Sequence, residues 1–290
     1  LLGFVVGVAR LSTNWLVAKL AAAYVETLRN VPLLLQLFFW YFAILQPLPG
    51  PRESLTLLPG VFLSNRGIVT PAIEHTSSSL AAFLLLIVGV TAAIFIHRWA
   101  RARRLRSGEI FPTSIVNIVI ILAPQALLWL AFGEPFTLEP AAIGKFDYVG
   151  GWRLLPEFLA LLLGLTLYTA AFIAEIVRAG IQSVGRGQTE AAHALGLSNG
   201  QTLRLVTIPQ ALRVIVPPLT SQILNLTKNS SLAVAIGYPD LVSVFAGTVL
   251  NQTGQAIEVI AITMAVYLVI SLATSLAMNL YNARVAIVER

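Results

Sequence analysis

Long apolar runs restrict the possible folds of this chain more than any other feature. With their flanking residues, four of them can each cross the roughly 30 Å apolar layer of a bilayer; they cover residues 80–96, 113–132, 154–177 and 257–280. Only 11% of the residues are charged, whereas an average soluble domain has about 25%. Backbone polar groups in lipid need internal partners, so such runs form helices. The sequence therefore predicts an all-α, polytopic membrane protein.

Three less regular apolar segments raise the expected number of crossings to seven. They cover residues 1–9, 31–45 and 211–236. The first is expected to be the tail of a truncated helix, with a segment missing before it. The last is expected to be a broken span, because it contains Pro217-Pro218 and the polar stretch 225–231.

Polar stretches separate these runs. Residues 10–29 are amphipathic and are expected to lie partly at the membrane interface. Residues 46–74 are rich in proline and show no sustained period, and 133–153 form a second polar loop, so both are expected outside the membrane. Residues 237–256 are expected to be irregular and polar.

The positions of the positive charges predict the orientation. Fourteen of the nineteen Lys and Arg residues are cytoplasmic if residues 187–210 and the C-terminus lie inside. Lys228 falls at membrane depth, and four lie outside: Arg52, Arg66, Lys145 and Arg153. The five arginines at 98–106 are interpreted as a topology signal, with contact to anionic lipid secondary. The net charge of +6 therefore indicates no nucleic-acid partner.

The polar stretch 187–210 has the sequence features of a short helix between two joints. Thr189 is expected to cap that helix, and Gly196 to end it in a left-handed conformation. Ser198 and Gln201 have the spacing of a capping box that starts a new helix. Pro209 is expected to close the unit. An element of this kind is suited to a groove on another protein.

This stretch resembles the EAA loop of ABC importer permeases. Glu190-Ala191-Ala192, Gly196 and the block ending at Pro209 keep the family's spacing, with two conservative replacements in that block. The resemblance implies that these residues form a coupling helix that docks on a cytoplasmic ATPase. The alternative is an ordinary amphipathic loop of another membrane protein.

Polar groups at membrane depth are candidates for a substrate path, because they are costly there. Lys228 is the clearest case, accompanied by Asn225, Asn229 and Ser230. An ammonium group can meet a substrate carboxylate; the alternatives are a hydrogen-bonded cluster between helices or a lysine that reaches the interface.

Glu175 and Arg178 have the three-residue spacing of an ion pair on one helix face. They lie at the cytoplasmic end of the span before the EAA loop, where they form either a gate or a plain intrahelical pair. Glu26 and Arg29 have the same spacing, and for them an intrahelical pair is expected.

The resemblance extends over most of the chain. Residues 168–183 and 24–36 resemble polar amino-acid permeases of the histidine/glutamine type. The inserted hairpin, with residues 51–54 and 65–67, and residues 225–231 are similar to a permease subunit of the general L-amino-acid transporter of Gram-negative bacteria. This implies a type I ABC importer transmembrane domain with five core helices and an inserted helical hairpin. The implied parts are residues 1–45, the insertion 46–153, and the core 154–290.

The resemblance also implies a function and partners. The chain would be the permease subunit of an ATP-driven, binding-protein-dependent importer of L-amino acids in the bacterial inner membrane, with a cytoplasmic C-terminus. Its partners would be a second homologous permease subunit, giving a heterodimer, two copies of an ATPase subunit, and a periplasmic binding protein. The ATPase would hold the ATP and magnesium.

The sequence gives no sign of catalysis on this chain. It has no cysteine, its three histidines lack ligand spacing, and it lacks a phosphate-binding loop, so no metal or cofactor is expected on it. The Gly-x-Ser-x-Gly pattern at 196–200 has no histidine after it, as a hydrolase triad requires. The rival interpretation is an ion-coupled secondary amino-acid carrier; Glu175 and Glu258 lie near helix ends, which argues against it. A structural subunit of a larger membrane enzyme is a third interpretation.

Overall fold

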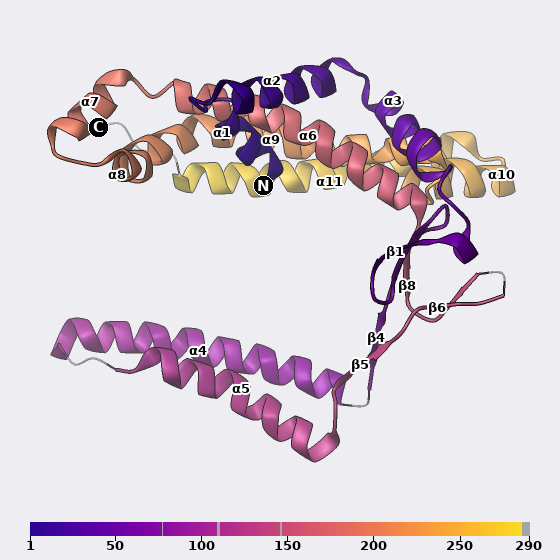
Figure 1. Cartoon of the computed structure of the whole chain (residues 1–290), viewed down its shortest axis with the longest axis horizontal. Helices are drawn as coiled ribbons and strands as arrows, with labels where there is room; N and C mark the ends of the chain where they lie inside the picture. Colours follow the sequence, from indigo (N-terminus) through magenta and orange to yellow (C-terminus); the bar gives the residue numbers. More distant parts are fainter. Residues whose placement is uncertain (77, 109–110, 146, 286–290) are drawn as a thin grey trace. The chain divides into compact units, whose positions relative to one another are not determined.

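The computed structural model describes residues 1–76, 78–108, 111–145 and 147–285. The contacts between its residues divide the chain into two units, and Figure 1 shows both. The core unit comprises Leu1–Leu48, Asn65–Gly67 and Leu154–Arg290. The inserted unit comprises Pro49–Ser64 and Ile68–Arg153.

The core unit is mostly helical in its described residues. Its α-helices are α1 (Leu2–Ala9), α2 (Trp15–Asn30), α3 (Leu33–Phe38), α6 (Pro156–Gln182), α7 (Arg186–Ala194), α8 (Asn199–Thr202), α9 (Ile208–Asn229), α10 (Leu250–Thr253) and α11 (Ala256–Val285). Between them lie the π-helical segments η1 (Phe39–Leu45), η3 (Leu203–Thr207) and η5 (Ser243–Val249) and the 3-10 helix η4 (Ser230–Ile236).

The inserted unit combines two long helices with short strands. The helices are α4 (Ser79–Ser107) and α5 (Thr113–Phe132), and a 3-10 turn, η2, covers Pro51–Glu53. The strands are β1 (Leu55–Leu58), β2 (Val61–Ser64), β3 (Gly67–Thr70), β4 (Ala72–His75), β5 (Phe136–Glu139), β6 (Ala142–Ile143), β7 (Tyr148–Val149) and β8 (Trp152–Leu154). They form a sheet of order β1-β2-β3-β8 and the pairs β4-β5 and β6-β7.

The expectation of loops without regular structure at 46–74 and 133–153 is therefore wrong in detail. Val69, Ala141 and Tyr148 form a small buried cluster there. Phe62 stacks on Tyr148 with 5.7 Å between the ring centroids. β4 pairs with β5 across more than sixty residues, and the strands of the two local pairs, β1-β2 and β6-β7, are at most four residues long, so a search for local periodicity does not reveal them.

Small residues allow neighbouring helices to approach α6 closely. A Cβ atom added to Gly3 of α1 would lie 2.6 Å from the Cβ of Ile173, and one added to Gly7 would lie 2.7 Å from the carbonyl oxygen of Ala174. Two glycines four residues apart, facing alanines of another helix, are typical of helix packing in membranes. This contact holds α1 against α6.

The other sides of α6 are packed in the same way. The side chain of Leu37 lies against Gly164, and that of Ile215 lies against Gly180. Two side-chain hydrogen bonds add to this packing: Tyr24 donates to the Leu167 carbonyl at 2.8 Å, and Tyr41 donates to Glu157 at 2.8 Å. With 44% of its most apolar stretch buried, α6 is the most buried of the four long apolar helices, and it is the centre of the core unit.

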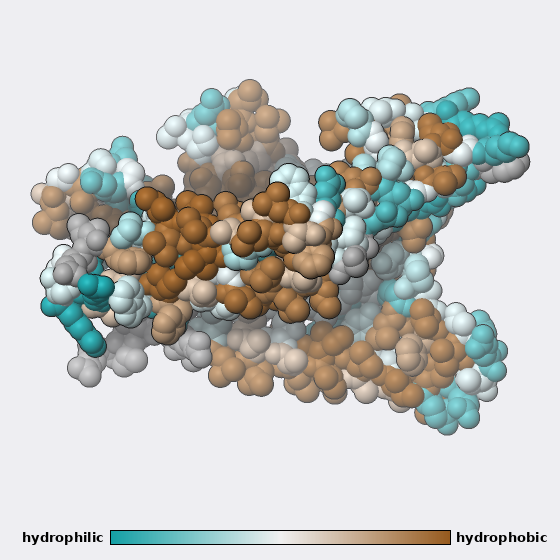
Figure 2. All heavy atoms as spheres, turned by 90° about the horizontal axis from the view of Figure 1, so that it is seen from below, coloured by the Kyte–Doolittle hydropathy of each residue, from teal (hydrophilic) through white to brown (hydrophobic). Residues whose placement is uncertain are grey.

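The four longest expected crossings are confirmed as helices. Among the described residues, α4, α5, α6 and α11 are long and apolar enough to cross a membrane. Figure 2 shows large patches of hydrophobic side chains on the visible face, with hydrophilic side chains gathered in separate areas beside them. On α11, Ile257, Met264 and Val269 are more than 60% exposed, as expected for a surface that meets lipid or another subunit.

Of the three other expected crossings, the segment at 1–9 is a short helix as expected, and the other two differ from the prediction. Residues 31–45 join α2 as a bent pair that turns by 106°, and Gln36, 5% exposed, stabilises the bend by donating to two backbone carbonyls. The segment at 1–9 contains the eight-residue helix α1. Helix α9 runs through Pro217-Pro218 without a break and ends at Asn229, since membrane helices tolerate proline where neighbouring groups take up the freed carbonyls.

The expectation of an irregular segment at 237–256 is also wrong. Most of it forms η5 and α10, which end at Gly254. Asp240 accepts a hydrogen bond from the Ser243 backbone N–H at 2.8 Å and so caps the start of this helical stretch. Polar composition alone suggested a loop, although these residues support a helix once it is capped.

The close contact between α1 and α6 yields a first prediction. Gly7→Leu places a large side chain where even a Cβ atom would overlap Ala174, so we expect the free energy of unfolding in detergent micelles to fall by about 1–3 kcal/mol. The control is Val8→Leu, which enlarges a side chain on the same helix that is 54% exposed and should leave stability unchanged. Equal loss in both variants would show that α1 does not depend on this contact.

Candidate functional site

The predicted coupling helix is α7, which begins earlier than the sequence suggested. Its N-cap is Gly185, in an extended conformation, so the expectation that Thr189 caps the helix is wrong. Thr189 lies within the helix and donates to the Arg186 carbonyl at 2.7 Å. Glu190 therefore follows the first turn and is exposed. The earlier start lengthens the helix to nine residues, or about 13 Å.

The end of α7 and the start of α8 follow the prediction. Gly196 adopts φ +80°, in the left-handed region where glycine ends a helix without strain. The Ser198 backbone N–H donates to the Gln201 side chain at 2.9 Å, and the Gln201 N–H donates to the Ser198 hydroxyl at 3.4 Å, which completes the capping box. Pro209, however, lies in the first turn of α9, so it begins the next helix and does not close this unit.

The two alanines of the EAA motif face in different directions. Ala192 is 3% exposed, whereas Ala191 is exposed. Gln210 of α9 donates to Gln188 of α7 at 3.1 Å and ties the short helix to the long one. Leu195, which sequence reasoning did not select, is 82% exposed at the C-cap. α7 thus offers Glu190, Ala191 and Leu195 on a fixed, exposed edge.

Glu175 is the centre of an ion cluster that joins three helices. The predicted pair with Arg178 is confirmed, because the Arg178 Nε donates to both carboxylate oxygens at 3.2 Å. Arg10, which follows α1, donates to the same carboxylate, and the Nη1 of Arg29 in α2 lies 4.0 Å from it. Glu26 pairs with Arg10 at 3.4 Å, so the expected pairing of Glu26 with Arg29 is wrong.

The ion cluster holds α1 and α2 on α6 near the end that leads to α7. Arg10 and Glu175 are 14% and 25% exposed, so the surroundings screen their attraction only partly. The guanidinium of Arg29 also lies 5.2 Å from the centre of the Phe172 ring. Sequence spacing identified only the local pair, because the other arginines reach Glu175 through the tertiary fold.

The polar segment at the end of α9 borders an open groove on the core unit. Its volume is about 830 Å³. The residues that line it come from the end of α9, from the segments that follow it and from α11; they are Lys228, Ser231, Val242, Ala261, Thr263, Met264, Ala265, Tyr267, Leu268 and Ser271. Lys228 is exposed, and it forms no ion pair within the described part of the chain.

Only some of the residues predicted to form the substrate path therefore line this groove. Asn225, Asn229 and Ser230 are not among its lining residues, and Glu175 and Arg178 belong to the ion cluster. The Ser230 and Ser231 hydroxyls donate to the carbonyls of Thr227 and Lys228 at 2.7 and 2.6 Å and so close the end of α9. An ammonium beside hydroxyl groups in a mostly apolar groove can bind a carboxylate.

The ion cluster yields a second prediction. Glu175→Gln removes the negative charge shared by the three arginines, and we expect the free energy of unfolding to fall by about 2 kcal/mol and backbone hydrogen exchange in α1 to accelerate. Glu26→Gln is the matched control: it touches only Arg10, is 60% exposed, and should change stability by less than about 0.5 kcal/mol. Similar effects of both changes would contradict a central role for Glu175.

Comparison with known proteins gives a consistent result. The model of the family described as "Binding-protein-dependent transport system inner membrane component" matches residues 1–287. The chain is 54% identical over 290 residues to the putative amino-acid ABC transporter permease protein YhdX of Escherichia coli K12, covering all of this chain and 74% of that protein. It is 50% identical to the general L-amino acid transport system permease protein AapQ of Rhizobium johnstonii, covering all of this chain and 72% of the relative.

A solved structure is similar in fold. The structure described as that of an amino acid ABC transporter with histidines aligns with a TM-score of 0.55 at 21% identity, over 98% of this chain and 83% of the other. At this identity the likeness concerns the fold alone.

Proposed function

This chain belongs to the family of binding-protein-dependent transport system inner membrane components, and from this we propose that it is the permease subunit of an ATP-driven importer of L-amino acids. Its long apolar helices make it a multi-pass membrane protein. Both relatives are named as amino-acid permeases, and they extend along this entire chain. The ion-coupled carrier is not retained, since the relatives are permeases of ABC systems.

The observation that carries the proposal is the structure of α7 and its attachment to α9. α7 is a short helix with an exposed edge. Gly196 and the capping box fix one of its ends, and Gln210 ties it to α9. A force applied to α7 outside the membrane would therefore be passed on to the long helix α9. A flexible loop would move on its own and would not pass that force on to α9. We assign to this edge the docking of a cytoplasmic ATPase, with Glu190 for polar contact, the alanines for close fit and Gly196 for the bend.

The proposal includes partners and an orientation. A second, homologous permease subunit would complete the path, two ATPase subunits would hold ATP and magnesium, and a periplasmic binding protein would deliver the amino acid. The C-terminus and α7 would lie in the cytoplasm, as the distribution of positive charge favours. Movement of α7 would then reorient the two permease subunits and open the path alternately to either side.

Within the path, we assign to Lys228 the recognition of the substrate carboxylate. The support is its position on an open groove with Ser231, Tyr267 and Ser271, and its lack of an ion-pair partner among the described residues. Asn225, Asn229 and Ser230 would line adjoining parts of the path. For Glu175 and Arg178 we propose a gate at the cytoplasmic end, in which the ion cluster keeps α1 and α2 closed on α6.

ATP hydrolysis by the reconstituted complex tests the assignment of α7. With Glu190→Arg, we expect stimulation by the loaded binding protein to fall about tenfold, which corresponds to the loss of about 1.4 kcal/mol of coupling, while the subunits still assemble. The control, Glu258→Arg, reverses the charge of another exposed glutamate, in the first turn of α11, and should leave stimulation intact. Unchanged uptake and hydrolysis in the first variant would rule out α7 as the coupling element.

Uptake of radiolabelled amino acid into proteoliposomes tests Lys228. Lys228→Met removes a charged hydrogen bond worth about 1.5–3 kcal/mol, so the half-saturating concentration should rise by about tenfold or more. Lys228→Arg should retain most of the affinity, and Lys19→Met, which removes an exposed lysine on α2, should retain all of it. Normal uptake by Lys228→Met would place carboxylate recognition elsewhere, without affecting the role of α7.

A further inference from the structure

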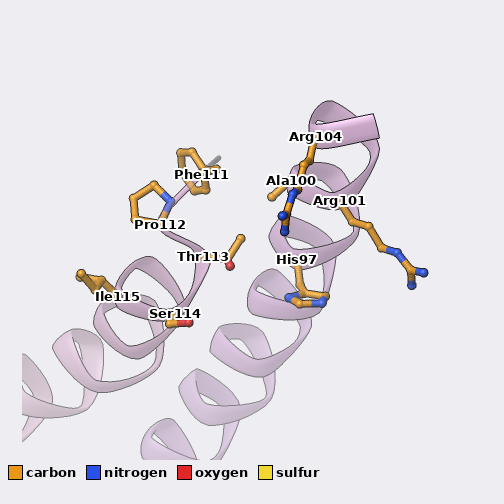
Figure 3. A pocket seen from close by; sticks show the side chains of 9 residues that line it. All are labelled: His97, Ala100, Arg101, Arg104, Phe111, Pro112, Thr113, Ser114 and Ile115. Carbon is orange, nitrogen blue, oxygen red and sulfur yellow. The ribbon is translucent and has the colours of Figure 1, made fainter. Parts of the chain in front are cut away.

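The inserted unit carries a cavity of its own at the end of its helical hairpin. It has a volume of about 550 Å³ and lies between the last turns of α4 and the first turn of α5. Figure 3 shows its lining residues: His97, Ala100, Arg101, Arg104, Phe111, Pro112, Thr113, Ser114 and Ile115. The proposed amino-acid path does not use this cavity, so its chemistry needs a separate explanation.

The cavity is basic on one wall and rich in hydrogen-bond donors on the other. His97, Arg101 and Arg104 follow each other at intervals of four and three residues and share a face of α4. In Figure 3 the guanidinium of Arg104 lies on the side of α4 that faces α5, whereas the Arg101 guanidinium extends outward. The hydroxyl groups of Thr113 and Ser114 belong to the opposite wall.

Nothing acidic in the described part of the cavity balances this charge. Neither Arg101 nor Arg104 forms an ion pair with a described residue. Between residues 79 and 132 the sequence has one acidic residue, Glu109, which lies outside the described residues. The first turn of α5 has no side-chain cap, so its backbone N–H groups add partial positive charge on the same side. The cavity thus favours an anion.

An aromatic cluster beside the cavity indicates its depth in the membrane. Trp99 and Phe111 meet edge to face with 5.5 Å between their centroids, and the Arg103 guanidinium lies 5.4 Å from the Trp99 ring centre. Trp99 is 45% exposed. Tryptophan is enriched at membrane interfaces, so this cluster favours a position of the cavity near the lipid head groups.

We propose that this cavity binds the phosphate of an anionic phospholipid, with Arg104 and His97 on one side and Thr113 and Ser114 on the other. The described lining residues include no carboxylate that would accept the ammonium of a zwitterionic head group, so a head group with a net negative charge is preferred. The helices beside it offer a surface for acyl chains: Leu105 is 82% and Ile115 67% exposed. The lipid would belong to the cytoplasmic leaflet, and this point alone rests on the orientation in the proposed function.

Lipid binding by the purified full chain in detergent tests this site. Native mass spectrometry would follow titrations with dioleoylphosphatidylglycerol, dioleoylphosphatidylcholine and inorganic phosphate. We expect one tightly bound phosphatidylglycerol, weaker phosphatidylcholine, and no competition from millimolar phosphate. Arg104→Gln should weaken phosphatidylglycerol binding about fivefold, since one arginine near a membrane surface contributes about 1 kcal/mol. Thr113→Val should weaken it by a smaller factor.

Arg106→Gln is the matched control. Arg106 lies in the same last turn of α4 and carries the same charge, but it does not line the cavity, so binding should be unchanged. Equal loss in the Arg104 and Arg106 variants would mean diffuse attraction and overturn the site. Equal binding of both lipids, or binding of free phosphate alone, would also overturn it.

One further outcome would point to a protein partner: loss of ATPase assembly in Arg104→Gln with unchanged lipid binding. Because the titration uses this chain alone and no ATP, its result is independent of the test on α7.

Discussion

The close approach of helices to α6 is the contact on which the core unit depends. In a membrane no hydrophobic effect drives apolar helices together, so dispersion at short range and a few polar contacts must hold them. Gly3 and Gly7 give α1 that short range, while Gly164 and Gly180 admit Leu37 and Ile215. α6 packs against α1, α2, α3 and α9, so a shift of α6 would displace all four of these helices.

This arrangement explains why the ion cluster and α7 lie where they do. Glu175 is near the end of α6, at the point where the packing of α1 and α2 gives way to the segment that leads to α7. A carboxylate shared by Arg10 and Arg178 adds directed bonds to the small-residue packing at that end, which continues to Gly180 and Ile215. α7 is joined to α6 by the short connection at 183–185 and to α9 by the hydrogen bond between Gln210 and Gln188.

The inserted unit follows a different principle. Its two helices bury little of their surface, and its strands form a separate small core around Tyr148. A hairpin that buries so little protein surface depends on lipid for its surroundings, which fits a lipid phosphate held at its end by Arg104 and Thr113. α7 and the groove both belong to the core unit, so the proposed lipid site is separate from the proposed coupling helix and substrate path.

The sequence alone determined the membrane class, the four long helices, the turn at Gly196 and the capping box at Ser198, because hydropathy, backbone conformation and capping are local properties. It did not determine the start of α7, the strands, or the unbroken path of α9. Nor did it show that Arg10, which follows α1, binds Glu175, or that Lys228 lines the groove while its neighbours Asn225, Asn229 and Ser230 do not. Only the tertiary structure decided these features, because they depend on which distant residues meet, and in a membrane that is set by close packing of small side chains.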